Sequence, residues 1–133
     1  MDQPRFTPNG MQVGDRLYVG VRRSGFVDGR HYTTYVDDVR RLKRVGALDQ
    51  AERLLLRLID ANEVESRESN WGVAPWYYEQ LAIVRRKKAD LRGELEVLER
   101  YARQEKALGA RPSKLVERLA KVRSMIHRTS AGA

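Results

Sequence analysis

The sequence contains no cysteine, which excludes disulfide bonds and thiolate metal sites. Its apolar runs are far shorter than the roughly 20 residues that cross a bilayer, so no membrane-spanning helix is expected. The first residues contain no apolar segment of the kind that directs secretion. These absences predict a cytoplasmic protein that makes no membrane contact.

Recognisable catalytic motifs are also missing, including the phosphate-binding loop, the dinucleotide-binding glycine motif, H-E-x-x-H and G-x-S-x-G. His31 and His127 have no metal-ligating neighbour at a useful spacing. Glu63, Glu65 and Glu68 lie close in sequence, but carboxylates there are expected to face solvent. We therefore expect no enzymatic activity, no metal and no cofactor.

Positive charge is what the sequence has in excess. Its 26 Lys and Arg exceed its 18 Asp and Glu, for a formal net charge of +8. Such a balance favours anionic partners, either nucleic acid or an acidic protein surface. Hydrophobic residues make up 41% of the 133 residues, enough for one folded domain with its own core.

Residues 1–31 differ from the rest because prolines and glycines interrupt any helix there. We interpret them as an irregular N-terminal arm. Within it, residues 16–21 are predicted to form one short strand and residues 26–27 a second, joined by a turn at 22–25 to give a β-hairpin.

From residue 32 onward, apolar residues recur at spacings of three and four, which indicates helices. The fold class is therefore predicted to be mainly α, with a helical domain over 32–128 and a frayed tail at 129–133. The predicted helices span residues 34–45, 48–66, 75–88 and 91–107, with a fifth that begins near 112.

Two segments of the helical domain repeat the same pattern. At an offset of 42 the matched pairs are Tyr35–Tyr77, Val39–Leu81 and Leu42–Val84. After one extra residue placed in the second turn, the pairs at an offset of 43 are Leu48–Leu91, Leu54–Val97, Leu55–Leu98 and Leu58–Tyr101. The repeat predicts two helical hairpins of one design, followed by a capping helix.

Residues 46–52, GALDQAE, and 76–82, WYYEQLA, carry a likeness to a known family. The chain resembles the tetratricopeptide repeat family over residues 33–107, although Arg85 and Glu94 depart from its pattern. Residues 32–101 are also similar to a segment of uncharacterised bacterial and phage proteins. The repeat resemblance implies a scaffold whose stacked first helices line a surface for peptides or partner proteins. Two hairpins are few for such a scaffold, so a homodimer or larger assembly is a further expectation.

Two basic clusters lie near the ends of the first helices of the two hairpins. The candidate binding residues in them are Arg40, Arg41 and Arg44, beside Lys43, and Arg85, Arg86, Lys87 and Lys88. One interpretation is that these cations offset the negative end of each helix dipole, by about 0.3–1 kcal/mol each. The other is that stacking of the hairpins joins the clusters into a phosphate-binding stripe. The first interpretation is favoured.

The last helix and the aromatic residues supply further candidates. Lys114, Arg118 and Lys121 share one helix face, which is either solvated or a basic arm for an anionic partner. Trp71 and Tyr77 belong to an aromatic group that could stack bases or anchor an interface, although packing in the core is favoured. In particular, Trp71 is expected to fold back over the hairpin junction.

These observations leave two hypotheses for function. The first is a non-catalytic protein–protein interaction module or adaptor with an acidic partner, such as a subunit of a larger assembly. The alternative is a nucleic-acid-associated protein that binds phosphates through basic helix faces, although no known nucleic-acid-binding motif supports it.

Overall fold

The computed structural model of the protein describes residues 24–106 and 112–132. Contacts between Cα atoms divide the chain into two compact units, Met1–Tyr35 and Val36–Ala133. The predicted boundary at residue 32 falls slightly earlier than this division. The difference arises because the Tyr35 hydroxyl donates a 2.6 Å hydrogen bond to the Val27 carbonyl, which holds Tyr35 within the first unit.

The first unit contains a small β-hairpin. Strand β1 (Phe26–Val27) pairs antiparallel with β2 (Arg30–His31), and a 3-10 turn, η2 (Tyr32–Tyr35), follows. The strand at residues 26–27 is thus confirmed, and it pairs with a strand at 30–31 that was not predicted. Of the predicted turn at 22–25, residues 24–25 form a turn and residues 22–23 lie outside the described residues. Asp28 and Gly29 form the turn with φ of 50° and 84°, the positive pair that a two-residue hairpin loop requires. Residues 16–21 lie outside the described residues.

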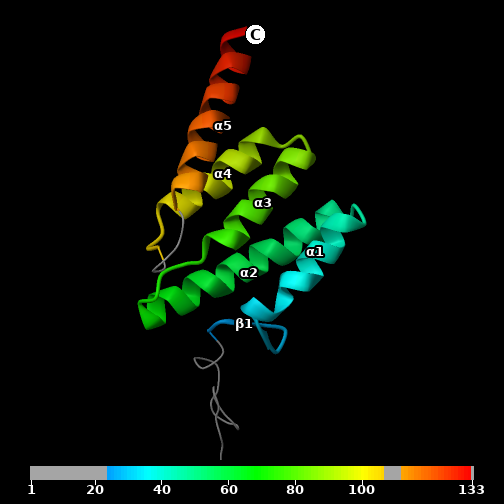
Figure 1. The fold of residues 1–133 in the computed structure, drawn as a ribbon, viewed down its shortest axis with the longest axis vertical. Coiled ribbons are helices and arrows are strands. Elements are labelled where there is room, and N and C mark those ends of the chain that lie inside the picture. The colour runs from blue at the N-terminus through cyan, green and yellow to red at the C-terminus, as the bar shows by residue number, and fades with distance from the viewer. Residues whose placement is uncertain (1–23, 107–111, 133) are drawn as a thin grey trace, which may run out of the picture. The chain divides into compact units, whose positions relative to one another are not determined.

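The second unit is helical, which confirms the mainly α fold class. Its described residues form helices α1 (Val36–Arg44), α2 (Leu48–Ser69), α3 (Pro75–Lys87), α4 (Leu91–Ala102) and α5 (Pro112–Gly132) (Figure 1). Each helix packs on the next one in sequence, and α3 also touches α5. The chain therefore builds two successive hairpins, α1–α2 and α3–α4, with α5 packed on the second.

Several predicted helix ends were wrong. Helix α2 continues to Ser69, where Asn70 adopts a φ of 61° and ends it. Helix α4 ends at Ala102, well before residue 107, because the chain turns there so that the Glu105 carbonyl can accept a 2.8 Å hydrogen bond from the Val73 N–H. Helix α5 continues to Gly132, through the segment 129–133 that was predicted to fray.

The turns that close the two hairpins have the same hydrogen bonds. The N–H groups of Gly46 and Ala47 donate to Lys43 and Leu42, at 3.1 and 2.9 Å. In the second hairpin, the N–H groups of Ala89 and Asp90 donate to Arg86 and Arg85, at 2.9 and 2.8 Å. Both turns are therefore Schellman caps, and equivalent residues in them are 43 positions apart in the sequence. The extra residue predicted in the second turn was therefore wrong, and Arg85, not Val84, is the counterpart of Leu42.

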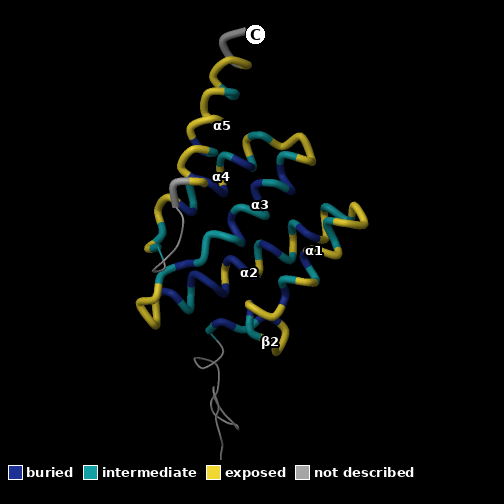
Figure 2. Tube along the Cα trace, viewed as in Figure 1, coloured by how far each residue is buried: buried dark blue, intermediate teal, exposed yellow. Residues whose placement is uncertain are grey.

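The core of the second unit lies between the helices, along their inward sides (Figure 2). Tyr78, Leu81 and Val84 of α3 are fully buried together, as the spacing predicted. Burial of one large aliphatic side chain stabilises the fold by about 1.5–3 kcal/mol. Leu115, Leu119 and Val122 supply the buried stripe of α5, so that helix is fixed by the same kind of contact.

Candidate interaction surface on α1, α3 and α5

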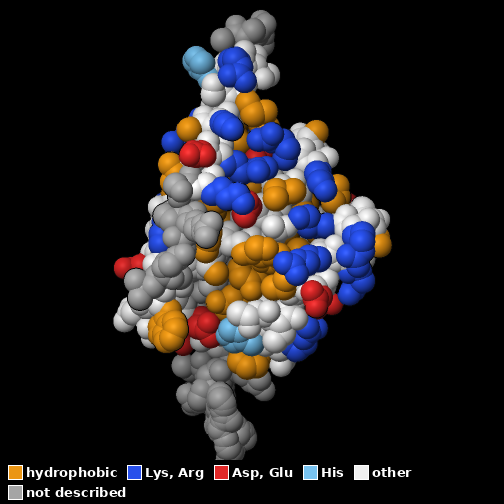
Figure 3. Space-filling view, viewed as in Figure 1, with side chains coloured by type: hydrophobic (Ala, Val, Ile, Leu, Met, Phe, Trp, Pro, Cys, Tyr) orange, Lys and Arg blue, Asp and Glu red, His pale blue; other side chains and the backbone are white. Residues whose placement is uncertain are grey.

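One side of α3 carries side chains at a helical spacing of three and four, and α1 and α5 lie along its two edges. We define the α1–α3–α5 face by residues that project from these helices on that side: Arg40, Lys43, Trp76, Glu79, Gln80, Ile83, Arg86, Lys87, Lys114, Arg118 and Lys121. Figure 3 shows many Lys and Arg side chains gathered over these helices, next to hydrophobic ones. This face is the main concentration of candidate binding residues.

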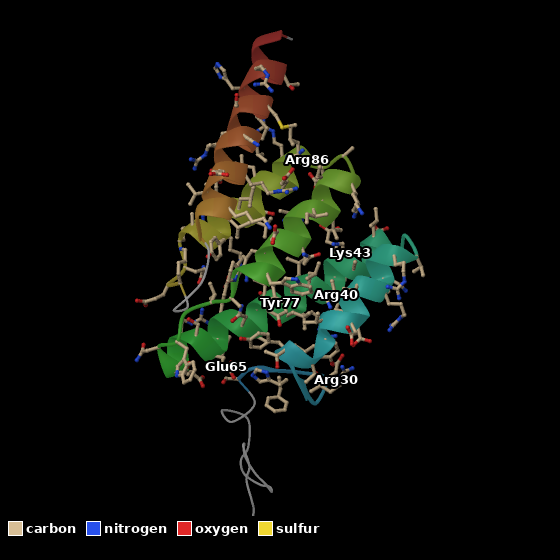
Figure 4. All side chains as sticks on the ribbon, in the orientation of Figure 1. Arg30, Arg40, Lys43, Glu65, Tyr77 and Arg86 are labelled. Atoms are coloured by element: carbon tan, nitrogen blue, oxygen red, sulfur yellow. The ribbon has the colours of Figure 1, made fainter. Side chains whose placement is uncertain are left out.

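Side chains from α1 meet those of α3 on this face (Figure 4). The Lys43 ammonium donates a hydrogen bond to the side-chain carbonyl of Gln80, and the Arg40 guanidinium lies 5.9 Å from the centre of the Trp76 ring. Burial lowers the pKa of Lys43, and the like charges of Lys87 and Arg40 lower it further, against a smaller opposite effect of Glu79. The first predicted cluster therefore lies against α3, the helix that carries the second cluster.

A buried carboxylate joins α3 and α5 beneath the face. Glu94 of α4 is completely buried. Its oxygens accept hydrogen bonds from Arg86, one of them 3.0 Å long, and from Arg118, at 2.7 Å. The side chains of Arg86 and Arg118 remain 39% and 26% exposed. One carboxylate thus serves two guanidinium groups, which leaves a positive charge and free N–H donors at the surface.

Other cations of the face are less engaged. Lys114 pairs with Glu79 at 3.1 Å, which links α5 to α3 a second time. Arg40 lies 3.8 Å from Asp37, whose side chain is almost fully exposed. Lys87 and Lys121 are exposed and make no ion pair or hydrogen bond within the described part of the chain. Positive charge on the face therefore exceeds the charge of the carboxylates that touch it.

Four predicted binding residues do not belong to this face. Arg85 is buried and bonds to Glu52 at 2.8 Å, to the Gly93 carbonyl at 2.9 Å and to Glu96 at 3.1 Å. Lys88 pairs with Asp49 at 2.6 Å and also with Glu52, and these hydrogen bonds raise its pKa. Arg85 and Lys88 thus fasten the second hairpin to α2. The other two lie on α1 and are exposed, with Arg41 paired to Asp38 at 3.2 Å and Arg44 at the end of the helix.

The aromatic residues divide between the core and the surface. Tyr77 is 4% exposed, and burial raises its pKa to about 12, so it packs as favoured by the sequence. Trp71 is 78% exposed, and the expectation that it folds back was wrong. The connection reverses at Asn70 and Gly72, with φ of 61° and 81°, and places Val73 in the core instead.

The expectation that Glu63 faces solvent was also wrong. Glu63 is 8% exposed and accepts a 2.7 Å hydrogen bond from the Tyr78 hydroxyl. Arg100 of α4 donates two more to it, at 2.7 and 2.9 Å, and one of 2.7 Å to Asp60. The signal was available in part, because Glu63 lies four residues after the buried Ile59 on the inward stripe of α2. The sequence does not indicate, however, that Tyr78 of α3 and Arg100 of α4 are the partners of Glu63.

A shallow cleft of about 320 Å³ lies among α2, α3 and α4. Leu56, Leu81 and Val97 form its apolar part, and Arg85, Glu96, Arg100 and Arg103 form the rest. Arg85 and Arg100 are already engaged in the ion pairs described above. The cleft therefore offers few groups to a ligand compared with the α1–α3–α5 face.

In the described residues, no three His, Asp or Glu side chains are grouped so that they could hold a metal ion. None of the helices in the same residues is long and apolar enough to span a bilayer. The nitrogen Nδ1 of His31 lies 2.8 Å from the Thr33 hydroxyl in the N-terminal unit, and His127 is exposed on α5. No protein-family model, curated protein or solved structure matches this chain.

Proposed function

We propose that this protein is a non-catalytic interaction module that binds an acidic partner protein through the α1–α3–α5 face. The observation that carries the proposal is that packing gathers cations from three helices on one face, where Lys43 bonds to Gln80 and where Arg118 shares Glu94 with Arg86. Like charges repel, so cations that packing holds on one face in excess of carboxylates favour an anionic partner. An anionic partner relieves that repulsion, and an uncharged partner does not.

The energetics favour an extended contact over a single anchoring pair. An exposed ion pair contributes only about 0.2–1 kcal/mol, so useful affinity requires several of them together with apolar contact. The face offers cations from three helices, with the half-buried Trp76 and Ile83 between them. Helices α1 and α3 are also the first helices of the two hairpins, which is where the tetratricopeptide resemblance expects a binding surface.

The proposal also includes a cellular compartment, an assembly state and an alternative partner. A chain without cysteine is compatible with a reducing compartment, and we place its action in the cytoplasm. The adaptor role includes membership of a larger assembly, which the exposed apolar side chain of Val116 on α5, 60% accessible, supports. Nucleic acid is the alternative partner, since Lys87 and Lys121 could bind phosphates equally well by charge alone.

The proposal is tested by capture of partners from host lysate with tagged protein, with and without nuclease, and identification by mass spectrometry. The test variant is K87E/K121E, which reverses two exposed cations of the face. Its matched control is R53E/R92E, on exposed positions of α2 and α4. Each replacement removes two units of charge, so both double variants carry +4 in place of +8.

We expect the tagged protein to capture specific proteins whose recovery does not change on nuclease treatment. The K87E/K121E variant should fail to recover them, and the R53E/R92E control should recover them as well as the unmodified protein does. If recovery depends on intact nucleic acid, the alternative replaces the adaptor. If both double variants retain the captured proteins equally, the binding surface lies elsewhere.

A further inference from the structure

The middle of the α1–α3–α5 face is partly apolar, and its edges are cationic. Along α3, the half-buried Trp76 and Ile83 alternate with Gln80 and Lys87 on one stripe. Arg40 and Lys43 border this stripe on the α1 side, and Lys114 and Arg118 border it on the α5 side. A ligand that fits the whole stripe must present apolar groups and anionic groups together.

The pair Arg86 and Arg118 forms the best-defined anion position on the face. Both guanidinium groups are oriented by Glu94, which is fully buried and hydrogen-bonded to each of them. Because the guanidinium planes are already fixed, a ligand carboxylate can accept hydrogen bonds from their outward N–H groups with little further loss of side-chain entropy. Planar, paired donors of this kind suit a carboxylate.

The aromatic groups of the face are poorly placed for nucleic acid. Proteins that bind single strands stack bases on accessible aromatic rings. Here Tyr77 is 4% exposed and meets the Trp76 ring edge-on, with centroids 5.0 Å apart. Arg40 lies over the Trp76 ring as well. The exposed Trp71 belongs to the connection before α3 and to none of the three helices.

The length of the stripe sets the size of the ligand. Trp76 and Lys87 lie three helical turns apart, which corresponds to about 16 Å at a rise of about 1.5 Å per residue. An extended peptide advances about 3.3 Å per residue and covers that span with about five residues. A short segment therefore reaches from the Trp76 end of the stripe to Lys87.

We infer that the α1–α3–α5 face recognises a short, extended peptide segment that contains both acidic and apolar residues, and that one of its carboxylates binds at Arg86 and Arg118. This inference rests on the proposed function and specifies the partner's chemistry. It follows from charge complementarity and the apolar stripe, and from a Trp76 ring that is half-buried and faced by Arg40, which leaves it less open to base stacking.

The test is fluorescence anisotropy with the full chain and three labelled probes near physiological ionic strength. The probes are a short peptide of Asp, Glu and Leu, the same peptide with Asn and Gln in place of the acids, and a single-stranded oligonucleotide of the same charge as the acidic peptide. We expect the acidic peptide to bind more tightly than either of the others. K87E/K121E should weaken that binding at least about fivefold, and R53E/R92E less than about twofold.

Two results overturn different statements. Tighter binding of the oligonucleotide than of the acidic peptide, again sensitive to K87E/K121E, would reject the peptide inference and leave the face as a phosphate-binding surface. Binding of no probe, or binding that K87E/K121E leaves unchanged, would reject the inference together with this use of the face. Capture from lysate then decides whether the module binds proteins through another surface.

Discussion

Ala89 adopts a backbone conformation that alanine disfavours, and its replacement by glycine should stabilise the protein. Its φ is 60°, in the left-handed region, because it is the closing residue of the Schellman cap after α3. The counterpart in the first hairpin is Gly46, with a φ of 79°. The chain therefore offers its own reciprocal experiment, Ala89→Gly and Gly46→Ala.

The magnitude follows from two opposing effects. A left-handed conformation costs an L-residue about 1–2 kcal/mol, and glycine escapes that cost. Glycine also has more freedom in the unfolded chain, which lowers stability by about 0.4–1 kcal/mol. The net expectation is a gain of about 0.5–1 kcal/mol for Ala89→Gly and a similar loss for Gly46→Ala. Within the described part of the chain, no heavy atom other than those of Gly46 and its two chain neighbours lies within 4 Å of a Cβ built on Gly46, so backbone strain sets the second value.

The assay is urea denaturation at 25 °C, with the free energy of unfolding obtained by linear extrapolation. Ala102→Gly is the control, because Ala102 is the exposed last residue of α4 and is in helical conformation, so that it should lose stability, by at most about 1 kcal/mol. If Ala89→Gly destabilises the protein as Ala102→Gly does, the turn is not left-handed and the equivalence of the two hairpin caps is refuted.

Two further predictions concern the buried carboxylates. Glu94→Ala leaves two guanidinium groups without their partner and should cost about 3 kcal/mol, the low end for a broken buried pair because both remain partly solvated. Faster hydrogen exchange in α5 than in α2 should accompany the loss, and equal exchange would show that Arg118 does not hold α5. Tyr78→Phe should cost about 1.5 kcal/mol in urea denaturation, since Glu63 keeps its bonds from Arg100. Burial raises the pKa of Tyr78 above its usual value of about 10, so folding stability is complete below that pH and falls as pH rises past it. Tyr78→Phe should make this alkaline loss shallower, and an unchanged slope would contradict the assignment.

The sequence determined the helices and their order. Apolar spacing within one segment states which side of a helix turns inward, and this information is local, so Tyr78, Leu81 and Val84 could be assigned to the core without knowledge of their partners. The turn at Gly46 could also be predicted from the sequence, because a glycine after a helical segment is a local signal for the end of the helix. The repeat was visible because Leu55 and Leu58 recur as Leu98 and Tyr101 in like positions.

The tertiary structure alone decided what the charged residues do. The sequence suggested dipole compensation or phosphate binding for Arg85 and Arg86 alike, yet packing buries Arg85 against Glu52 and places Arg86 beside Glu94. Charged side chains carry no periodic signal, because a helix tolerates them on its outer side and, when paired, on its inner side. The partner of Glu94 on α5 lies 24 residues away in the chain.

The same separation explains the candidate surface. Lys43 and Lys87 belong to different hairpins, and only helix packing sets Lys43 against Gln80, on the stripe of α3 that also carries Lys87. The sequence could state that both are basic and close to helix ends. Which cations end up together on an exposed face depends on how helices cross, and crossing is set by the fit of buried side chains across the whole unit.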